Sequence, residues 1–217
     1  MLPELKDFEA LLESSKVLMK DRHGLKVIAT PDGRIMKFFR RKRLLSSALW
    51  NPYAKRFAKN AARLTQMGIP TVEVTGVWRI SSLKRDVVAY KRLEGESLRD
   101  LEKTPELFGK LAAFISDLHE KGVFFRSVHF GNILELPDGC LALIDMADLT
   151  FKGRPLTANE RLRNFGHLMK YREDQEPLEA FGVKRFIMLY HQAAGHSGPG
   201  SEAFGQEFAR KLAQAAG

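Results

Sequence analysis

Three short apolar runs near the amino end, separated by two tight-turn sequences, are the feature that most constrains the fold. The runs lie at 16–20, 25–30 and 34–39, with "DRHG" and "PDG" between them. Gly, Asp and Pro favour tight turns, and runs this short suit strands better than helices. The pattern therefore predicts an antiparallel meander of three strands.

Two helices and two more strands are expected in the same part of the chain. The second helix should be capped by Asn51, with Pro52 in its first position and Gly68 at its end. The sheet should then have five strands, with this helix packed on it. The expected helices cover 3–14 and 51–68, and the further strands cover 71–80 and 85–93.

From Gly95 onward the apolar pattern becomes mainly helical. One or two helices are expected over 97–122, followed by a short hairpin at 132–145 and by further helices to the carboxyl end. Strands followed by helices indicate an α+β fold. We expect two lobes, a sheet-rich one at 1–92 and a mainly helical one at 93–217, within one unit.

The charge is distributed unevenly. Residues 20–92 hold 18 Lys and Arg against 4 Asp and Glu, a balance of +14, whereas the rest of the chain carries −5. The densest cluster is "KFFRRKR" at 37–43. Such a cluster is either a solvated basic face or a surface for an anionic partner, namely nucleotide phosphates, a phosphorylated glycan, an acidic membrane or nucleic acid.

Two polar residues flank the expected hairpin. Asp145 follows the apolar run "LALI", and Asn132 precedes its partner strand "ILEL". The hairpin would bring an amide oxygen and a carboxylate together, and oxygen ligands suit Mg²⁺. Taken singly, the two residues could be a turn asparagine and a strand-end cap, but their joint spacing favours a metal site.

Lys37 lies in the third strand of the expected meander. Its neighbours Met36 and Phe38 should point to the opposite face of the sheet. A lysine in a strand is usually a surface residue, so Lys37 indicates a functional site only in combination with other motifs.

The run "LHEKGVFFRSVHFGNILELPDGCLALIDMAD" at 118–148 resembles the catalytic segment of the protein-kinase-like superfamily. The form "HFGNIL" is similar to the lipopolysaccharide kinase (Kdo/WaaP) family. The stretches "RIMKFFRRKRLLSS", "MGIPTVEV", "YKRLEGESL" and "RLRNFGHLMKY" resemble its toluene-tolerance-protein subgroup. The resemblance covers residues 15–175 and implies a protein-kinase-like fold that uses ATP and Mg²⁺.

The resemblance also assigns roles to residues. Lys37 matches the lysine that contacts the ATP phosphates, and Tyr90 begins the segment that borders the adenine. Asn132 and Asp145 match the Mg²⁺ ligands, so both also bind the cofactor.

Four departures from the family pattern bear on activity. The phosphate loop retains one glycine, Gly24, and Phe57 and Asn60 occupy the helix face where a glutamate should pair with the lysine. The D-F-G motif reads Asp145-Met146-Ala147. Ser127 stands where an aspartate should orient the substrate hydroxyl.

The serine bears most directly on catalysis. Positioning by a general base contributes a factor of about 10² to 10⁴ in rate, or about 3–5 kcal/mol. Because phosphoryl transfer is largely dissociative, slow transfer is compatible with Ser127. His129 or Asp148 is a candidate substitute base, and His129 is alternatively a structural hydrogen bonder. Ser127 as a covalent nucleophile is disfavoured, because no G-x-S-x-G turn surrounds it.

Further polar residues have weaker claims to a function. His119 is expected to pack at a helix end. Arg161, Arg163 and Asn164 either face an anionic substrate or brace the helical lobe, and bracing is the preferred interpretation.

Three functional hypotheses follow. The first is a lipopolysaccharide-core kinase that phosphorylates an inner-core sugar, with its basic part against the inner membrane or an anionic glycolipid. The second is a pseudokinase or scaffold for envelope assembly. The third, nucleic-acid association, lacks a recognition motif and is unlikely.

The expected location is the cytoplasm. No apolar run approaches the roughly 20 residues of a membrane span, and the start of the chain does not have the pattern of a signal peptide. The single cysteine, Cys140, fits a reducing compartment.

Overall fold

The computed structural model describes residues 5–41, 52–195, 204–208 and 210. The chain divides into two compact units, Met1–Leu93 and Glu94–Gly217, and each is described by itself. Several expectations lie outside the described residues. These are Pro3 and Asn51 as helix-start residues, Lys42 and Arg43 in the basic cluster, and most of the break at 195–201.

The first unit is built on a five-stranded antiparallel sheet, with the strand order β1-β2-β3-β5-β4. The predicted meander is therefore correct, since its three strands pair consecutively. β5 then inserts between β3 and β4, which leaves β1 and β4 at the edges. The strands are β1 (Lys16–Asp21), β2 (Gly24–Ala29), β3 (Arg34–Arg40), β4 (Val74–Ile80) and β5 (Arg85–Lys91).

One face of the sheet forms an apolar core with the helix α1 (Leu5–Ser14). Met36 and Phe38 of β3 are 4% and 5% exposed and belong to this core. Phe8 of α1 packs on Phe38, with ring centroids 6.2 Å apart. The alternation of side chains along a strand therefore places Lys37 on the other face, as predicted.

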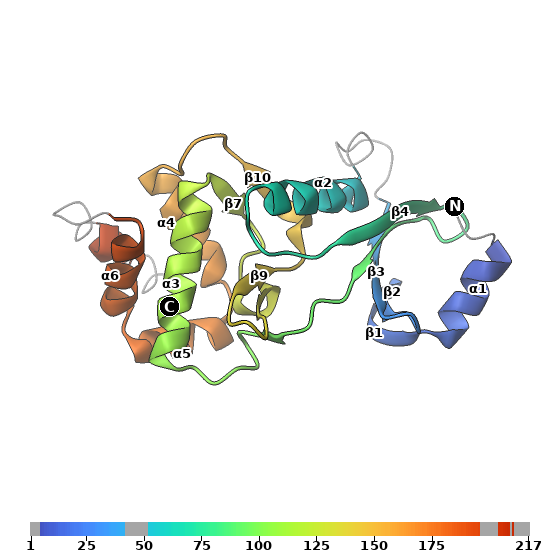
Figure 1. The fold of residues 1–217 in the computed structure, drawn as a ribbon, viewed down its shortest axis with the longest axis horizontal. Coiled ribbons are helices and arrows are strands. Elements are labelled where there is room, and N and C mark those ends of the chain that lie inside the picture. The colour runs from blue at the N-terminus through green and yellow to red at the C-terminus, as the bar shows by residue number, and fades with distance from the viewer. Residues whose placement is uncertain (1–4, 42–51, 196–203, 209, 211–217) are drawn as a thin grey trace. The chain divides into compact units, whose positions relative to one another are not determined.

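The helix α2 (Tyr53–Gln66) packs on that other face and runs along the sheet in Figure 1. Its fully buried Phe57 contacts Phe39 of β3 and Tyr90 of β5. The helix starts one residue later than expected, because Pro52 is its N-cap residue with an extended backbone and not its first helical residue. Gly68 follows the end with a φ of 69°, a left-handed conformation that suits a glycine after a helix.

The second unit is organised around the helix α3 (Pro105–Glu120), beside which α6 (Val183–Ala193) lies. The expectation of helix over 97–104 was wrong, since Ser97 belongs to a two-residue strand. The helix starts only at Pro105, because Thr104 adopts an extended backbone before the proline and caps the Leu107 amide at 3.2 Å.

Short strands and single turns connect the helices of this unit. The predicted hairpin is present as β8 and β9, and β6 pairs with β8. β7 pairs with β10 in a separate two-stranded sheet. The remaining elements are β6 (Glu96–Ser97), β7 (Val123–Phe125), β8 (Ile133–Glu135), β9 (Leu141–Leu143), β10 (Leu149–Phe151), α4 (Ala158–Leu168) and α5 (Arg172–Phe181).

None of the helices within the described ranges is both long enough and apolar enough to span a bilayer.

Candidate functional site

The β8–β9 hairpin brings Asn132 and Asp145 to the same end of two paired strands. Ile133 lies opposite Leu143, and the Ile144 amide donates to the Asn132 carbonyl at 3.0 Å. The Asn132 side chain is nearly buried, with 8% of the residue exposed, and its Nδ2 donates to the Ser127 carbonyl at 2.8 Å. This bond orients the amide and leaves Oδ1 as the atom that can meet a cation.

Asp145 has an unusual backbone for a residue other than glycine. Its φ of 60° and ψ of 45° lie in the left-handed region, which costs of order 1 kcal/mol and occurs often at functional sites. Met146 and Ala147 after it are 0% and 4% exposed, so burial of the next two residues holds the turn in place. Asp145 is thus turned out of the strand direction by the packing of its neighbours.

Ser127 lies in a backbone segment that is fixed on both sides. The Arg126 amide donates to the Asp148 carbonyl at 3.2 Å, and Val128 is 1% exposed. The Ser127 carbonyl is held by Asn132 and its residue is half-buried. The segment therefore has a defined shape, but position 127 carries a hydroxyl, which cannot supply the charge of a carboxylate.

His129 is held by a cation and an aromatic ring. Its Nδ1 lies 3.5 Å from Nη2 of Arg99, and its ring meets Tyr171 edge to face with centroids 5.1 Å apart. Burial lowers the pKa of His129, and the Arg99 charge lowers it further. Because a guanidinium only donates, Nδ1 is the acceptor and the neutral ring carries its proton on Nε2. This geometry favours His129 as a hydrogen bonder, and its role as a substitute base stays a prediction.

Arg99 and Asp174 were missed by the sequence reasoning. Asp174, in the first turn of α5, is 0% exposed and receives Nε and Nη2 of Arg99 at 3.0 and 2.9 Å. Its Oδ2 also accepts the Phe130 amide at 3.2 Å. The pair therefore anchors the turn that precedes Asn132. The partners are 75 residues apart and lie in unremarkable polar stretches, so no local signal identified them.

A buried chain of hydrogen bonds supports the same segment from the other side. Asn164 of α4 donates from Nδ2 to the Phe125 carbonyl at 2.7 Å and contacts Nε2 of His119 through Oδ1 at 2.9 Å. His119 in turn contacts the Tyr190 hydroxyl at 2.9 Å, and Arg161 donates to that hydroxyl at 2.7 Å. Bracing, the preferred interpretation for Arg161 and Asn164, agrees with these contacts.

The donor-to-acceptor direction of these hydrogen bonds requires His119 to be neutral. Arg161 donates to Tyr190, Tyr190 donates to Nδ1 of His119, and Nε2–H donates to Asn164. Burial lowers the pKa of His119 to about 4, while the bond to Asn164 opposes this shift. His119 is therefore a neutral residue that is buried in the last turn of α3. Packing near the helix end was expected from the sequence, whereas the neutral state was not.

In the first unit, Lys37 and Tyr90 lie on the sheet face that α2 covers. The Lys37 ammonium is 5.8 Å from the centroid of the Phe39 ring. The Tyr90 ring stacks on Phe57, with centroids 5.3 Å apart, so this ring takes part in helix–sheet packing. α2 contains no Asp or Glu, and the glutamate expected to pair with the lysine is thus missing from this helix, with Phe57 and Asn60 buried in its place.

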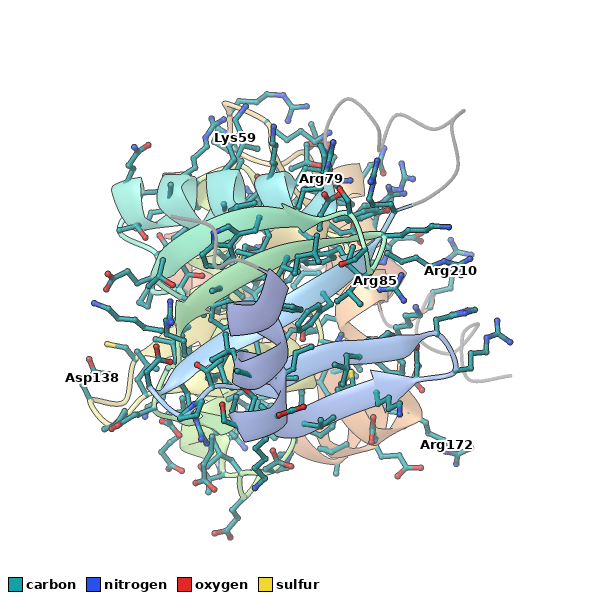
Figure 2. All side chains as sticks on the ribbon, turned by 90° about the vertical axis from the view of Figure 1, so that its right-hand side faces the viewer. Lys59, Arg79, Arg85, Asp138, Arg172 and Arg210 are labelled. Carbon is teal, nitrogen blue, oxygen red and sulfur yellow. The ribbon has the colours of Figure 1, made fainter. Side chains whose placement is uncertain are left out.

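The expected phosphate loop is a tight turn between β1 and β2. Asp21 pairs with Gly24, so only Arg22 and His23 form the connection. The His23 amide donates to Oδ1 of Asp21 at 2.8 Å, and Arg85, labelled in Figure 2, donates to the His23 carbonyl at 2.5 Å. Side chains thus support this turn where a longer glycine-rich loop would offer backbone amides.

Within the described ranges, no group of three or more His, Cys, Asp or Glu side chains is arranged to hold a metal ion. A site made of Asn132 and Asp145 therefore supplies two protein ligands, and the remaining ligands must come from water or substrate.

Comparison with known proteins identifies the fold. The sequence matches no protein-family model and no curated protein. The structure of WaaP in complex with acyl carrier protein is similar over 94% of this chain and 92% of that one, with 18% identity and a TM-score of 0.55. An aminoglycoside-3'-phosphotransferase of type VIII matches over 92% and 97%, with 13% identity and a TM-score of 0.61. The chain has a protein-kinase-like fold.

A third similar structure supports the same conclusion. WbdD, a bifunctional kinase-methyltransferase, matches over 86% of this chain and 48% of its own, with 15% identity and a TM-score of 0.50. The predicted kinase-like fold is therefore confirmed, and WaaP is among the similar structures. Membership of the toluene-tolerance-protein subgroup stays a prediction.

Proposed function

We propose that the protein is a phosphotransferase that uses ATP and Mg²⁺ to phosphorylate a sugar hydroxyl of the lipopolysaccharide inner core. The observation that carries the proposal is the pairing of Asn132 with Asp145 at one end of the β8–β9 hairpin. The kinase-like fold supports the proposal. The choice of an inner-core sugar as the acceptor follows the family that the sequence resembles.

The donor set fits Mg²⁺. This ion prefers oxygen ligands and usually keeps several waters, with one or two carboxylates and substrate phosphates completing its shell. Oδ1 of Asn132 and the Asp145 carboxylate match that demand, since Nδ2 of Asn132 is already committed to Ser127. When bound, the ion neutralises charge that develops on the phosphate oxygens.

The other roles follow the family resemblance. We assign Lys37 to the nucleotide phosphates and the segment beginning at Tyr90 to the adenine. Asn132 and Asp145 hold the Mg²⁺–ATP complex, and the fixed backbone at Ser127 lines the place of the attacking hydroxyl. Without a carboxylate at 127, the proton of the attacking hydroxyl passes to a phosphate oxygen or to water, and transfer is slower by a factor of about 10² to 10⁴.

A thermal-shift titration with ATP and Mg²⁺ tests the nucleotide site. Wild-type protein should be stabilised by ATP with Mg²⁺, and Asp145→Ala should lose that shift. Asp138→Ala is the matched control, because Asp138 is an exposed carboxylate at the turn of the same hairpin (Figure 2). Each shift is measured against the same variant without ligand. Equal shifts for wild type and Asp145→Ala would contradict the site.

A pseudokinase is the second candidate, and three observations favour it. α2 contains no Asp or Glu, the phosphate turn is short, and position 127 carries no carboxylate. Phosphate transfer to purified core oligosaccharide, followed by mass spectrometry, separates the candidates. Turnover that disappears in Asp145→Ala excludes the pseudokinase, whereas nucleotide binding without any transfer supports it.

We also propose a cytoplasmic location with peripheral contact to the inner membrane. The edge strand β1 exposes Val17, Leu18 and Met19 at 49%, 48% and 53% between the exposed Lys16 and Lys20. Apolar side chains flanked by cations suit an anionic lipid surface. Co-sedimentation with phosphatidylglycerol vesicles, but not with phosphatidylcholine vesicles, is the expected result. Nucleic acid stays an unlikely partner.

A further inference from the structure

A cluster of cations beside Ser127 stands apart from the proposed metal ligands. It consists of Arg126, which immediately precedes Ser127, Arg163 of α4, and Lys170 just after α4. All three are exposed, and their charges act together on the half-buried His167. We call these three cations with His167 the cationic cluster.

The backbone framework brings the cluster together. The bond from Asn164 to the Phe125 carbonyl, 2.7 Å long, docks α4 on the end of β7, one residue before Arg126. Arg163 precedes Asn164, and His167 lies one helical turn further along α4. The His167 ring rests edge to face on Phe124 of β7, with centroids 5.9 Å apart. Packing of α4 on β7 therefore brings together two positions of α4, Arg163 and His167, and two positions that follow the elements, Arg126 after β7 and Lys170 after α4.

The described residues supply the cluster with no counterion. Within the described part of the chain, no carboxylate pairs with Arg126, Arg163 or Lys170, and the ring nitrogens of His167 have no hydrogen-bond partner. Nearby, Glu160 neutralises both Lys152 and Arg154, at 3.2 and 2.8 Å. Lys152 and Arg154 thus have a carboxylate partner, whereas the three cations of the cluster do not. Burial first, and then the cluster cations, lower the pKa of His167, so its ring is neutral and can donate one N–H.

Unpaired like charges repel one another and cost stability unless an anion joins them. Two guanidinium groups are also suited to bidentate binding of phosphate or carboxylate. We infer that the cationic cluster is an acceptor subsite, which binds a phosphate monoester or carboxylate carried by the sugar to be phosphorylated. This inference rests on the proposed phosphotransfer function and names the chemical class of its acceptor.

The position of the cluster supports an acceptor role. Arg126 is exposed and immediately precedes Ser127, the residue that the family resemblance places beside the attacking hydroxyl. We expect an anion held by the cluster to position a neighbouring hydroxyl of the same molecule. Arg161 and Asn164 on the same helix are used for internal bonds, whereas Arg163 is exposed. Bracing of the helical lobe therefore applies to Arg161 and Asn164, and contact with an anionic substrate applies to Arg163.

Direct binding without nucleotide tests the subsite independently of phosphotransfer. Isothermal titration compares glucose 6-phosphate, glucuronate, inorganic phosphate and uncharged glucose. Wild-type protein should prefer the two charged sugars over glucose, and Arg163→Gln should weaken their binding about 10-fold or more. Lys184→Gln is the matched control, since it removes an exposed helix cation outside the cluster and should bind as wild type. Added salt should weaken binding in wild type.

Several results would overturn the inference. Equal affinity of the wild-type protein for glucose and glucose 6-phosphate would show that the protein has no preference for anionic sugars. Equal losses of sugar affinity in Arg163→Gln and Lys184→Gln would show that the cluster is not the binding site. Binding of inorganic phosphate as tight as glucose 6-phosphate with no binding of glucuronate indicates a free-phosphate site. A matching loss of ATP binding in Arg163→Gln makes the cluster a nucleotide site. If that variant does not fold, the His167 proton resonances of wild type must shift with glucose 6-phosphate and not with glucose.

The two proposals fail separately. Absence of nucleotide binding or of phosphate transfer counts against the kinase function. The comparison of sugar affinities can still be interpreted, because it is measured without nucleotide. An intact kinase activity combined with unselective sugar binding counts against the acceptor subsite alone.

Discussion

The buried pair of Arg99 and Asp174 allows a sharp test of what holds the segment around Ser127. Asp174→Ala removes a bidentate partner from Arg99, whose side chain is 28% exposed, and leaves the amide of Phe130 without an acceptor. Breaking a buried pair costs about 3–5 kcal/mol, and an unpaired buried amide alone costs about 1–3 kcal/mol. Glu173 still pairs with Arg99 at 2.7 Å, so we expect the lower end, about 3 kcal/mol.

Glu173→Ala is the matched control. The residue neighbours Asp174 and contacts the same arginine, but its carboxylate side chain is 57% exposed. Exposed pairs contribute only about 0–1 kcal/mol. The isosteric Asp174→Asn keeps an acceptor for Phe130 and should fall between the two alanine variants.

Urea unfolding followed by circular dichroism measures the three free energies. For a chain of this size, the melting temperature should also fall by about 2–4 °C per kcal/mol, or about 6–12 °C for Asp174→Ala. If Asp174→Ala and Glu173→Ala are equally destabilising, burial does not distinguish the two carboxylates and the reasoning is refuted.

Three further outcomes are expected. Because the folded protein keeps the pKa of His119 near 4 against 6.5 in the unfolded chain, the unfolded state binds the extra proton and stability falls by about 3 kcal/mol as pH drops from 6.5 to 4. A pH series of urea midpoints should show this loss in wild type and a smaller one in His119→Gln, and parallel curves would contradict it. Gly122→Ala should cost more than about 3 kcal/mol, since its φ is 70° and a Cβ would lie 2.1 Å from the Arg154 carbonyl oxygen. Gly153→Ala, at a φ of 69° with nothing within 4 Å, should cost only about 1–2 kcal/mol, and equal unfolding energies would refute the close approach. Ser127→Asp should raise the rate of phosphate transfer by about 10² to 10⁴, whereas Ser127→Ala should leave it unchanged; in a radiolabel assay, no gain would show that another departure limits the reaction.

Local patterns predicted the sheet well. Apolar alternation and two turn sequences were sufficient for the meander at 16–39, because tight turns restrict neighbouring strands to antiparallel pairing. The same alternation placed Lys37 opposite Met36 and Phe38, as the structure has it. The hairpin that joins Asn132 and Asp145 was also predicted, since its strands are connected by a short turn.

Contacts between distant polar residues were not predictable in this way. Arg99 and Asp174 are 75 residues apart, and His119 meets Tyr190 across 71. Such pairs depend on how helices pack and leave no period in the sequence. The helix prediction for 97–104 was wrong for another reason. The helix-forming composition of this stretch is overridden by Pro105 and by the pairing of Ser97 with β8. The assignments of Lys37, Tyr90, Ser127, His129, Asn132 and Asp145 to the reaction remain predictions.

The segment from Phe125 to Phe130 is secured at both ends by side chains that do not react. Asn164 binds the carbonyl at its start, and Asp174 binds the amide at its end. The side chain of Ser127 makes no contribution to either anchor. The residue at 127 can therefore be exchanged without unfolding the protein, so that the chemistry which this position supports can change while the scaffold persists.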